Sequence, residues 1–201
     1  MHFNLSAQTN SLNFIKEDKM STNRQKSFIA EMSTDIGHLD FPRLTHGKKV
    51  TYSYINPWTG SQETIDISNY LFAKKKKPKI TLKFYFRCTG NHYHIYIRTP
   101  GAYYGRILGM NEDDAITATG DKDATNFNLL DNYGKVITLD DISSDKLTLQ
   151  IQTTHGDLLT GQTFKKWSEG HYVTASGGGN MDFHLNIIER NASYLDDPDE
   201  V

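Results

Sequence analysis

Cysteine is almost absent from this chain. Cys88 is the only cysteine among 201 residues, so no disulfide can form within the chain and the fold must rest on packing. Long hydrophobic runs are missing as well, because no stretch approaches the roughly 20 consecutive apolar residues that a membrane-spanning helix requires. The first 20 residues also lack an apolar run of signal-peptide length. We therefore expect no membrane span and no classical secretion, with the cytoplasm as the default location.

An excess of charge of either sign is missing too. Lys and Arg number 22 against 24 Asp and Glu, which gives a formal net charge of -2. Phosphate backbones and anionic lipids attract proteins that carry an excess of positive charge. Because this chain carries none, general binding to nucleic acid is not expected. The mean hydropathy of -0.59 and the hydrophobic content of 37% indicate a soluble globular protein with a polar surface.

The chain length suits one domain with unstructured ends. Residues 1–27 are rich in Ser, Thr, Asn, Gln and Lys, and we expect a flexible N-terminal arm there. Residues 191–201 form an acidic C-terminal tail, so the predicted domain covers residues 28–190. The arm needs a partner surface to become ordered, which predicts a homo-oligomer or larger assembly. Its expected anchors are Phe3, Leu5, Phe14 and Ile15.

Runs of β-branched and aromatic residues, several alternating with polar residues, dominate the predicted domain. Each run is bounded by Gly, Asn, Asp or Pro, and no window longer than about ten residues shows the apolar spacing of a capped helix. The expected strands cover residues 50–55, 80–86, 92–97, 136–139 and 147–151. Many short strands with regular turns predict an all-β barrel or sandwich.

Two parts of the chain repeat each other locally. One contains Ile-Thr-Ala-Thr-Gly and then Phe-Asn-Leu, and the other contains Val-Thr-Ala-Ser-Gly and then Phe-His-Leu. The paired segments are 116–120 with 173–177, 127–129 with 183–185, and, upstream of both, 97–105 with 151–161. A period in the mid-fifties that contains several strands indicates a multi-strand repeat unit rather than a short solenoid coil.

These repeats resemble those of the β-trefoil group, in its fascin-like and ricin-B-like branches, over about residues 92–190. Repeats in that group commonly read strand, G-x-Y-L, V-T-A, polar loop and F-x-L. The resemblance implies a β-trefoil-like pseudo-threefold barrel. The first third of the chain would be its third lobe, with residues 80–86 as the closing strand, although no V-T-A or G-x-Y-L occurs there. The alternative that the same strand pattern permits is an antiparallel two-sheet β-sandwich.

No assembled reactive group is evident, so we expect a binding module rather than an enzyme. Cys88 has the aromatic strand context of a packed thiol. His92 and His94 share one strand face, but two ligands do not make a metal site, and neither a metal nor a cofactor is predicted. The segment Lys74–Lys79, with five lysines, is either a basic finger for an anionic partner or a solvated loop, and we expect it to be a contact element outside the core.

Exposed aromatic residues beside polar turns suit sugar binding, because a flat ring stacks on the apolar face of a pyranose while polar side chains bind its hydroxyls. The candidate ligand-binding residues form two clusters, Tyr103, Tyr104 and Arg106, and Trp167, His171 and Tyr172. Core packing is the competing role for their rings. The predicted function is glycan binding, lectin-like and non-catalytic. The alternative is a protein-binding or structural module of the cytoskeletal, inhibitor-like or toxin-associated kind.

Overall fold

The computed structural model describes residues 21–164 and 170–194, and every structural statement below concerns those residues. Strands dominate them, as the sequence predicts. The strands are β1 (Phe28–Thr34), β2 (His38–Asp40), β3 (Thr51–Ile55), β4 (Gln62–Asp66), β5 (Phe72–Lys74), β6 (Lys83–Thr89), β7 (His92–Ile97), β8 (Ile107–Met110), β9 (Ile116–Thr119), β10 (Phe127–Leu130), β11 (Val136–Ile137), β12 (Lys146–Thr153), β13 (Thr160–Gln162), β14 (His171–Thr174), β15 (Gly179–Asn180) and β16 (Phe183–Arg190). The helical elements are α1 (Pro42–His46) and the 3-10 turns η1 (Asp121–Asp123) and η2 (Leu139–Asp141). None of them has the length and apolar character that crossing a membrane requires.

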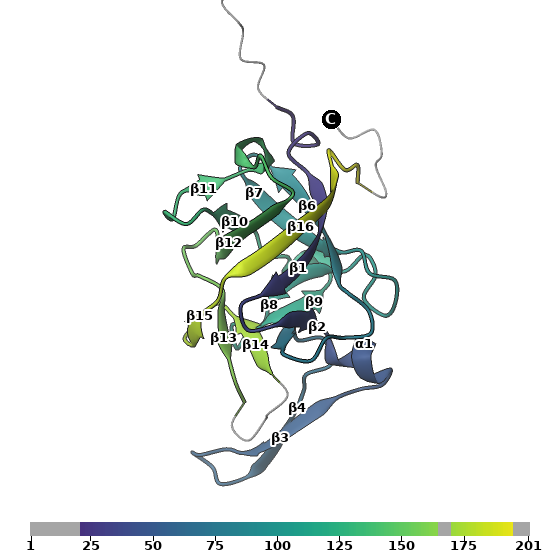
Figure 1. Ribbon diagram of the computed structural model, residues 1–201. Coiled ribbons are helices and arrows are strands. Elements are labelled where there is room, and N and C mark those ends of the chain that lie inside the picture. Colours follow the sequence, from purple (N-terminus) through teal and green to yellow (C-terminus); the bar gives the residue numbers. More distant parts are fainter. Residues whose placement is uncertain (1–20, 165–169, 195–201) are drawn as a thin grey trace, which may run out of the picture.

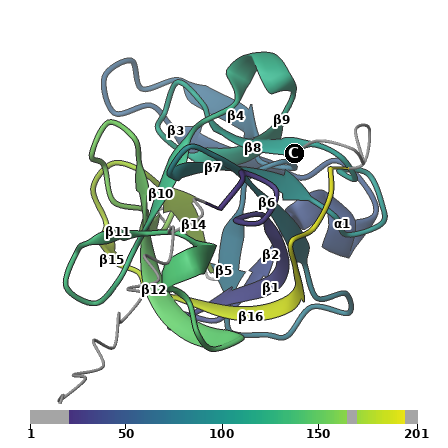
Figure 2. The same ribbon diagram turned by 90° about the horizontal axis from the view of Figure 1, so that it is seen from above.

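Six strands close into a barrel. Antiparallel pairing runs from β1 through β16, β12, β10, β7 and β6 and returns to β1. Figure 2, a view from above, shows these strands as a ring around a central axis. Closure removes the free strand edges that an open sheet would expose. The prediction of an all-β barrel is therefore confirmed in its general form, and a sandwich of two open sheets is not what the chain forms.

Alternating side chains fill the barrel. Strand β1 buries every second residue, as the period-two geometry of a strand dictates. The rings of Phe28 and Phe86, from neighbouring strands, stack with centroids 4.5 Å apart, and Tyr93 meets Phe28 edge-on. Phe127 and Phe183, the closing aromatics of the sequence repeat, are also fully buried on barrel strands. The repeated phenylalanines are therefore core residues.

Three hairpins, β2–β5, β8–β9 and β13–β14, lie at one end of the barrel (Figure 1). Leu71, immediately before β5, donates its N–H to the carbonyl of Ile116 (2.8 Å) and accepts a bond from the N–H of Val173 (2.8 Å). All three side chains are almost completely buried. Ile116 and Val173 begin the two repeated I/V-T-A segments, and Leu71-Phe72-Ala73 occupies the equivalent place in the β2–β5 hairpin. Its sequence differs from theirs at the middle position, where Phe72 replaces threonine.

The hairpin β3–β4 forms a separate two-stranded sheet. It is inserted between β2 and β5, after α1, and projects away from the barrel at the bottom of Figure 1. The sequence predicts its first strand but not its detachment from the main sheet. This projection creates one wall of the candidate site described below.

The two ends of the domain contact the barrel. Ser27, which the sequence places in the arm, is 2% exposed, and its Oγ accepts a hydrogen bond from the N–H of Cys88 (2.9 Å). Ala192, in the predicted tail, is 1% exposed. Packing thus extends a few residues beyond 28–190 on both sides. The anchors Phe3, Leu5, Phe14 and Ile15 lie outside the described residues, and assembly through the arm stays a prediction.

Candidate ligand-binding site

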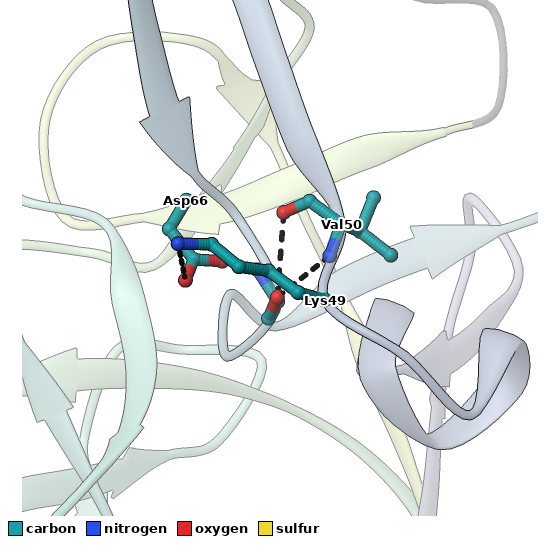
Figure 3. Close-up of polar contacts among 4 residues, drawn as sticks. Lys49, Val50 and Asp66 are labelled. Atoms are coloured by element: carbon teal, nitrogen blue, oxygen red, sulfur yellow. Dashed lines mark hydrogen bonds and ion pairs between the residues drawn. The ribbon is translucent and has the colours of Figure 1, made fainter.

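The base of the β3–β4 hairpin is fixed by a small polar network (Figure 3). The N–H of Val50 donates to Ser68 Oγ (2.8 Å), and the Ser68 hydroxyl donates back to the Val50 carbonyl (3.3 Å). Asp66 accepts a bond from the Ser68 N–H (3.0 Å), and its other oxygen lies 3.2 Å from Lys49 Nζ. These contacts hold both strands where they leave the body of the protein, which sets the direction of the hairpin.

A row of stacked aromatic rings connects this hairpin to β14. Tyr52 and Tyr54 are two residues apart on β3, so their side chains share a face, and their centroids lie 6.1 Å apart at an interplanar angle of 8°. The ring of Phe164 stacks between Tyr52 (4.6 Å) and Tyr172 (4.5 Å). Tyr70 meets Tyr172 edge-on at 6.3 Å. Side chains from four separate segments therefore form one apolar wall.

These rings line a cavity of about 770 Å³, which we call the aromatic cavity. Ile55, Pro57 and Ile65 of the hairpin and Ala115 of the body add to its apolar surface, while Asp113 and Gln162 are among its polar side chains. Sites for small organic ligands commonly have volumes of about 300 to 1,000 Å³ and combine an apolar lining with a few polar groups. The aromatic cavity has both properties.

Hydrogen bonds hold the rims of the aromatic cavity. The Tyr54 hydroxyl donates to Glu63 Oε2 (2.6 Å), and Asn56 Nδ2 donates to Glu63 Oε1 (2.6 Å). These bonds stabilise the carboxylate, so they lower the pKa of Glu63 and raise the pKa of Tyr54. On the opposite wall the Tyr172 hydroxyl donates to Gln162 Oε1. Two tyrosines are thereby held in place at neutral pH.

The electrostatic character of the aromatic cavity is weakly negative. Asp113 is the only charged residue among its described lining residues. Burial raises the pKa of Tyr70 and of Tyr172, and the charge of Asp113 acts in the same direction at both. Both hydroxyls stay neutral at physiological pH. The Tyr70 hydroxyl, which accepts a bond from Asn111 Nδ2 (2.9 Å), can donate to a ligand, and the Tyr172 hydroxyl, which donates to Gln162, can accept from one. The cavity therefore suits a neutral or cationic ligand that carries hydroxyl groups.

The predicted cluster around β14 is divided between two cavities. Tyr172 lines the aromatic cavity, whereas His171 lines a second cavity beside β5. Successive residues of a strand point to opposite faces, which explains why these neighbours do not act together. Trp167 lies outside the described residues.

The other predicted cluster lies on the loop between β7 and β8. Tyr103 is 7% exposed and packs against Phe41 with centroids 5.2 Å apart, so the expectation of an exposed ring is wrong for this residue. Burial raises the pKa of Tyr103. Tyr104 is 49% exposed and Arg106 is exposed as well, but neither lines either of the two cavities.

Four ring residues of the aromatic cavity were missed by the sequence reasoning: Tyr52, Tyr54, Tyr70 and Phe164. The spacing of Tyr52 and Tyr54 indicates that they share one strand face. Nothing in the sequence shows that this face turns toward Phe164, more than 100 residues later in the chain. The site arises from tertiary packing of the inserted hairpin.

The other candidate groups have structural surroundings. Cys88 is 1% exposed, as expected of a packed thiol, and burial raises its pKa. His92 and His94 lie with ring centroids 6.3 Å apart. Among the residues that the structure describes, no group of three or more His, Cys, Asp or Glu side chains is arranged to hold a metal ion. Lys74, which the sequence places in an exposed basic loop, is instead buried on β5 with its Nζ 2.9 Å from Asp40 Oδ2.

A scan against protein-family models and searches of curated proteins and of solved structures found no match to this chain.

Proposed function

We propose that the chain is a non-catalytic glycan-binding module whose sugar site is the aromatic cavity. The observation that carries this proposal is the row of stacked rings beside Asp113 and Gln162 in a cavity of about 770 Å³. A sugar offers an apolar face for ring contacts and a rim of hydroxyls for amide, carboxylate and phenol groups. The cavity presents both kinds of partner, with Tyr52 and Tyr54 on the hairpin and Asp113, Gln162 and Tyr172 on the body of the protein.

We also propose that the fold is a β-trefoil. Support comes from the order of the chain, in which each of the hairpins β2–β5, β8–β9 and β13–β14 lies between two barrel strands. Further support comes from the buried residues Leu71, Ile116 and Val173, which join the three hairpins through equivalent backbone segments. In this arrangement the β3–β4 hairpin is an insertion in the first lobe that supplies half of the sugar site.

The charge of the aromatic cavity favours neutral or amino sugars. Because Asp113 is the only charged group among the described lining residues, an acidic sugar would place its carboxylate near a like charge without a cation to pair with it. Sialylated and uronic acid glycans should therefore bind more weakly than their neutral counterparts.

A glycan array tests the proposal with wild type and two matched variants. Tyr52→Ala removes a ring from the cavity, and Tyr104→Ala removes an exposed ring outside it. We expect wild type and Tyr104→Ala to bind the same neutral or amino glycans. The loss of one stacking ring, about 1 to 2 kcal/mol, should weaken binding by Tyr52→Ala about 5- to 30-fold. An array without hits, or equal losses in the two variants, would contradict the proposal.

Protein binding is the second candidate function. Its support is the connection between β3 and β4, where Trp58 is 93% exposed and the neighbouring Ile55 is 63% exposed. Exposed apolar groups that gather on a projecting element are typical of protein contact sites. An array without hits, together with capture of a protein partner that Trp58→Ser abolishes, would favour this function over glycan binding.

A further inference from the structure

A second cavity of about 790 Å³, which we call the lysine cavity, lies beside α1, β5 and the segment that follows β5. Its walls are largely aliphatic. Leu44 of α1 and Leu82 before β6 form part of the lining, and Ala73 of β5 adds a small apolar surface. Ile80 is 49% exposed at this cavity, so part of its aliphatic side chain is accessible to a ligand. The cavity can therefore receive a hydrocarbon group.

The charges around the lysine cavity are strongly asymmetric. Lys75, Lys76, Lys77 and Lys79 all line it, all are exposed, and none forms an ion pair within the described part of the chain. The only carboxylate among the described lining residues is Asp40.

Asp40 cannot balance these lysines, because it is already paired. Its Oδ2 lies 2.9 Å from Lys74 Nζ, and the two side chains are only 4% and 10% exposed. This ion pair neutralises both of its members inside the wall. Among the described lining residues, four positive charges therefore have no carboxylate left to compensate them.

A buried polar atom lies on the same cavity. Nδ1 of His171, another lining residue, is buried and has no hydrogen-bond partner in the described residues. Buried polar atoms are normally paired, and leaving one unpaired costs about 1 to 3 kcal/mol. An oxygen of an acidic ligand could accept a hydrogen bond from the tautomer protonated at Nδ1.

We propose that the lysine cavity binds an amphiphilic anion, a molecule with an aliphatic body and a carboxylate, sulfate or phosphate group. The aliphatic body packs against Leu44, Ile80 and Leu82, and the acidic group lies among the lysines. Both parts are needed, because exposed lysines alone bind a small anion weakly under physiological screening. The two cavities have only Thr163 in common among their described lining residues, so a change in the rings of the aromatic cavity leaves the walls of the lysine cavity in place.

Calorimetric titration of the full chain with decanoate tests this proposal, with decanol and inorganic phosphate as separate probes. Decanoate should bind at least tenfold more tightly than either probe, because only decanoate satisfies both the aliphatic wall and the lysines. Ile80→Ser should weaken decanoate binding about three- to tenfold. Tyr52→Ala should leave it unchanged, which separates this site from the glycan site.

Two quadruple variants provide the matched comparison. The cavity variant carries Gln at Lys75, Lys76, Lys77 and Lys79, and the control variant carries Gln at Lys83, Lys122, Lys135 and Lys146, all of which are exposed elsewhere. Both change the net charge by the same amount. We expect at least a tenfold weaker affinity for decanoate in the cavity variant alone.

Several results would overturn the proposal. If decanol bound as tightly as decanoate, the lysines would have no role in binding. If phosphate bound as tightly as decanoate, the aliphatic wall would have none. If both quadruple variants lost the same affinity for decanoate, the effect would come from net charge and not from the cavity. Binding to vesicles that contain phosphatidylglycerol, without binding of decanoate, would show a surface contact with lipid headgroups in place of a cavity site.

Discussion

Asp40 and Lys74 form an ion pair that is almost completely removed from water, with side chains 4% and 10% exposed. Removing one member leaves a buried charge without its partner, at a cost of about 3 to 5 kcal/mol. We therefore expect Lys74→Met to lower the free energy of unfolding by that amount. The double variant Asp40→Leu and Lys74→Met should lose much less, because both charges are gone. Urea denaturation measures the free energy of unfolding of each variant. The interpretation would be contradicted if the double variant lost as much stability as Asp40→Leu and Lys74→Met lose together.

His94 makes stability depend on pH. Burial lowers its pKa, the charges of His92 and Arg87 act in the same direction, and Asp121 opposes them. Below the unfolded-state pKa of about 6.5 the unfolded chain binds more protons than the folded one, so stability falls as the pH decreases from there toward the folded-state pKa. The Tm should be lower at pH 5.5 than at pH 7.5, and His94→Gln should reduce that difference. His155→Gln, at an exposed site, should not. An unchanged difference in His94→Gln would refute this role.

The exposure of two residues, Tyr103 and Lys74, was predicted wrongly from the sequence. The aromatic character of Tyr103 suggested a ligand contact, but its ring packs on Phe41 and belongs to the core. The run of lysines suggested a solvated loop, but Lys74 is the last residue of β5 and points into the protein. In both cases burial depends on a residue far away in the chain, Phe41 for Tyr103 and Asp40 for Lys74, and the local sequence does not show that partner.

At the scale of elements, the β3–β4 hairpin depends on its base. Ser68 is 4% exposed and makes hydrogen bonds in both directions with Val50. Ser68→Ala leaves the Val50 N–H unpaired, which costs about 1 to 2 kcal/mol. Hydrogen exchange should therefore become about five- to thirtyfold faster in the amides of β3 and β4, with little change in β1. Ser53→Ala, which removes an exposed hydroxyl bond on the hairpin itself, is the control, and equal effects of the two substitutions would contradict the anchoring role.

Gly109 permits the close contact between β8 and η1. A Cβ atom at this position would lie 2.1 Å from the carbonyl oxygen of Asp123, which is backbone and cannot rotate away. Gly109→Ala should therefore destabilise the protein by about 1 to 3 kcal/mol through overpacking. Gly179→Ala is a matched control because a Cβ there would have no neighbour within 4 Å. Thermal unfolding measures both variants, and equal Tm values would show that the contact is not required.

Only some of the barrel strands were predicted. The runs of β-branched and aromatic residues in β7 and β12 were recognised in the sequence, whereas β1, which buries every second residue, and β16 were not. The strand β5 was not predicted. Phe72 on it belongs to a cluster against which Tyr52 of the inserted hairpin and Phe164 pack, and the local sequence does not show these partners.

For the whole molecule, closure of the barrel depends on contacts between distant parts of the chain. Strand β1 lies between β6 and the final strand β16, so the two ends of the domain complete the same ring (Figure 1). The sequence predicts the class of fold through its many short strands. It does not predict the two cavities, because each is assembled from segments that closure and the hairpin insertion bring together. Tyr172 was predicted by its residue type, and its partners Tyr52 and Phe164 were not.

The most direct test of the glycan proposal is to locate the bound sugar on the full chain. Backbone amide shifts of ¹⁵N-labelled protein, recorded while the strongest array ligand is added, report which residues the ligand contacts. We expect the largest changes at Tyr52, Tyr54, Ala115 and Tyr172, around the aromatic cavity. Changes confined to the loop of residues 101–106 or to Lys75–Lys79, or no changes with any array glycan, would contradict the account.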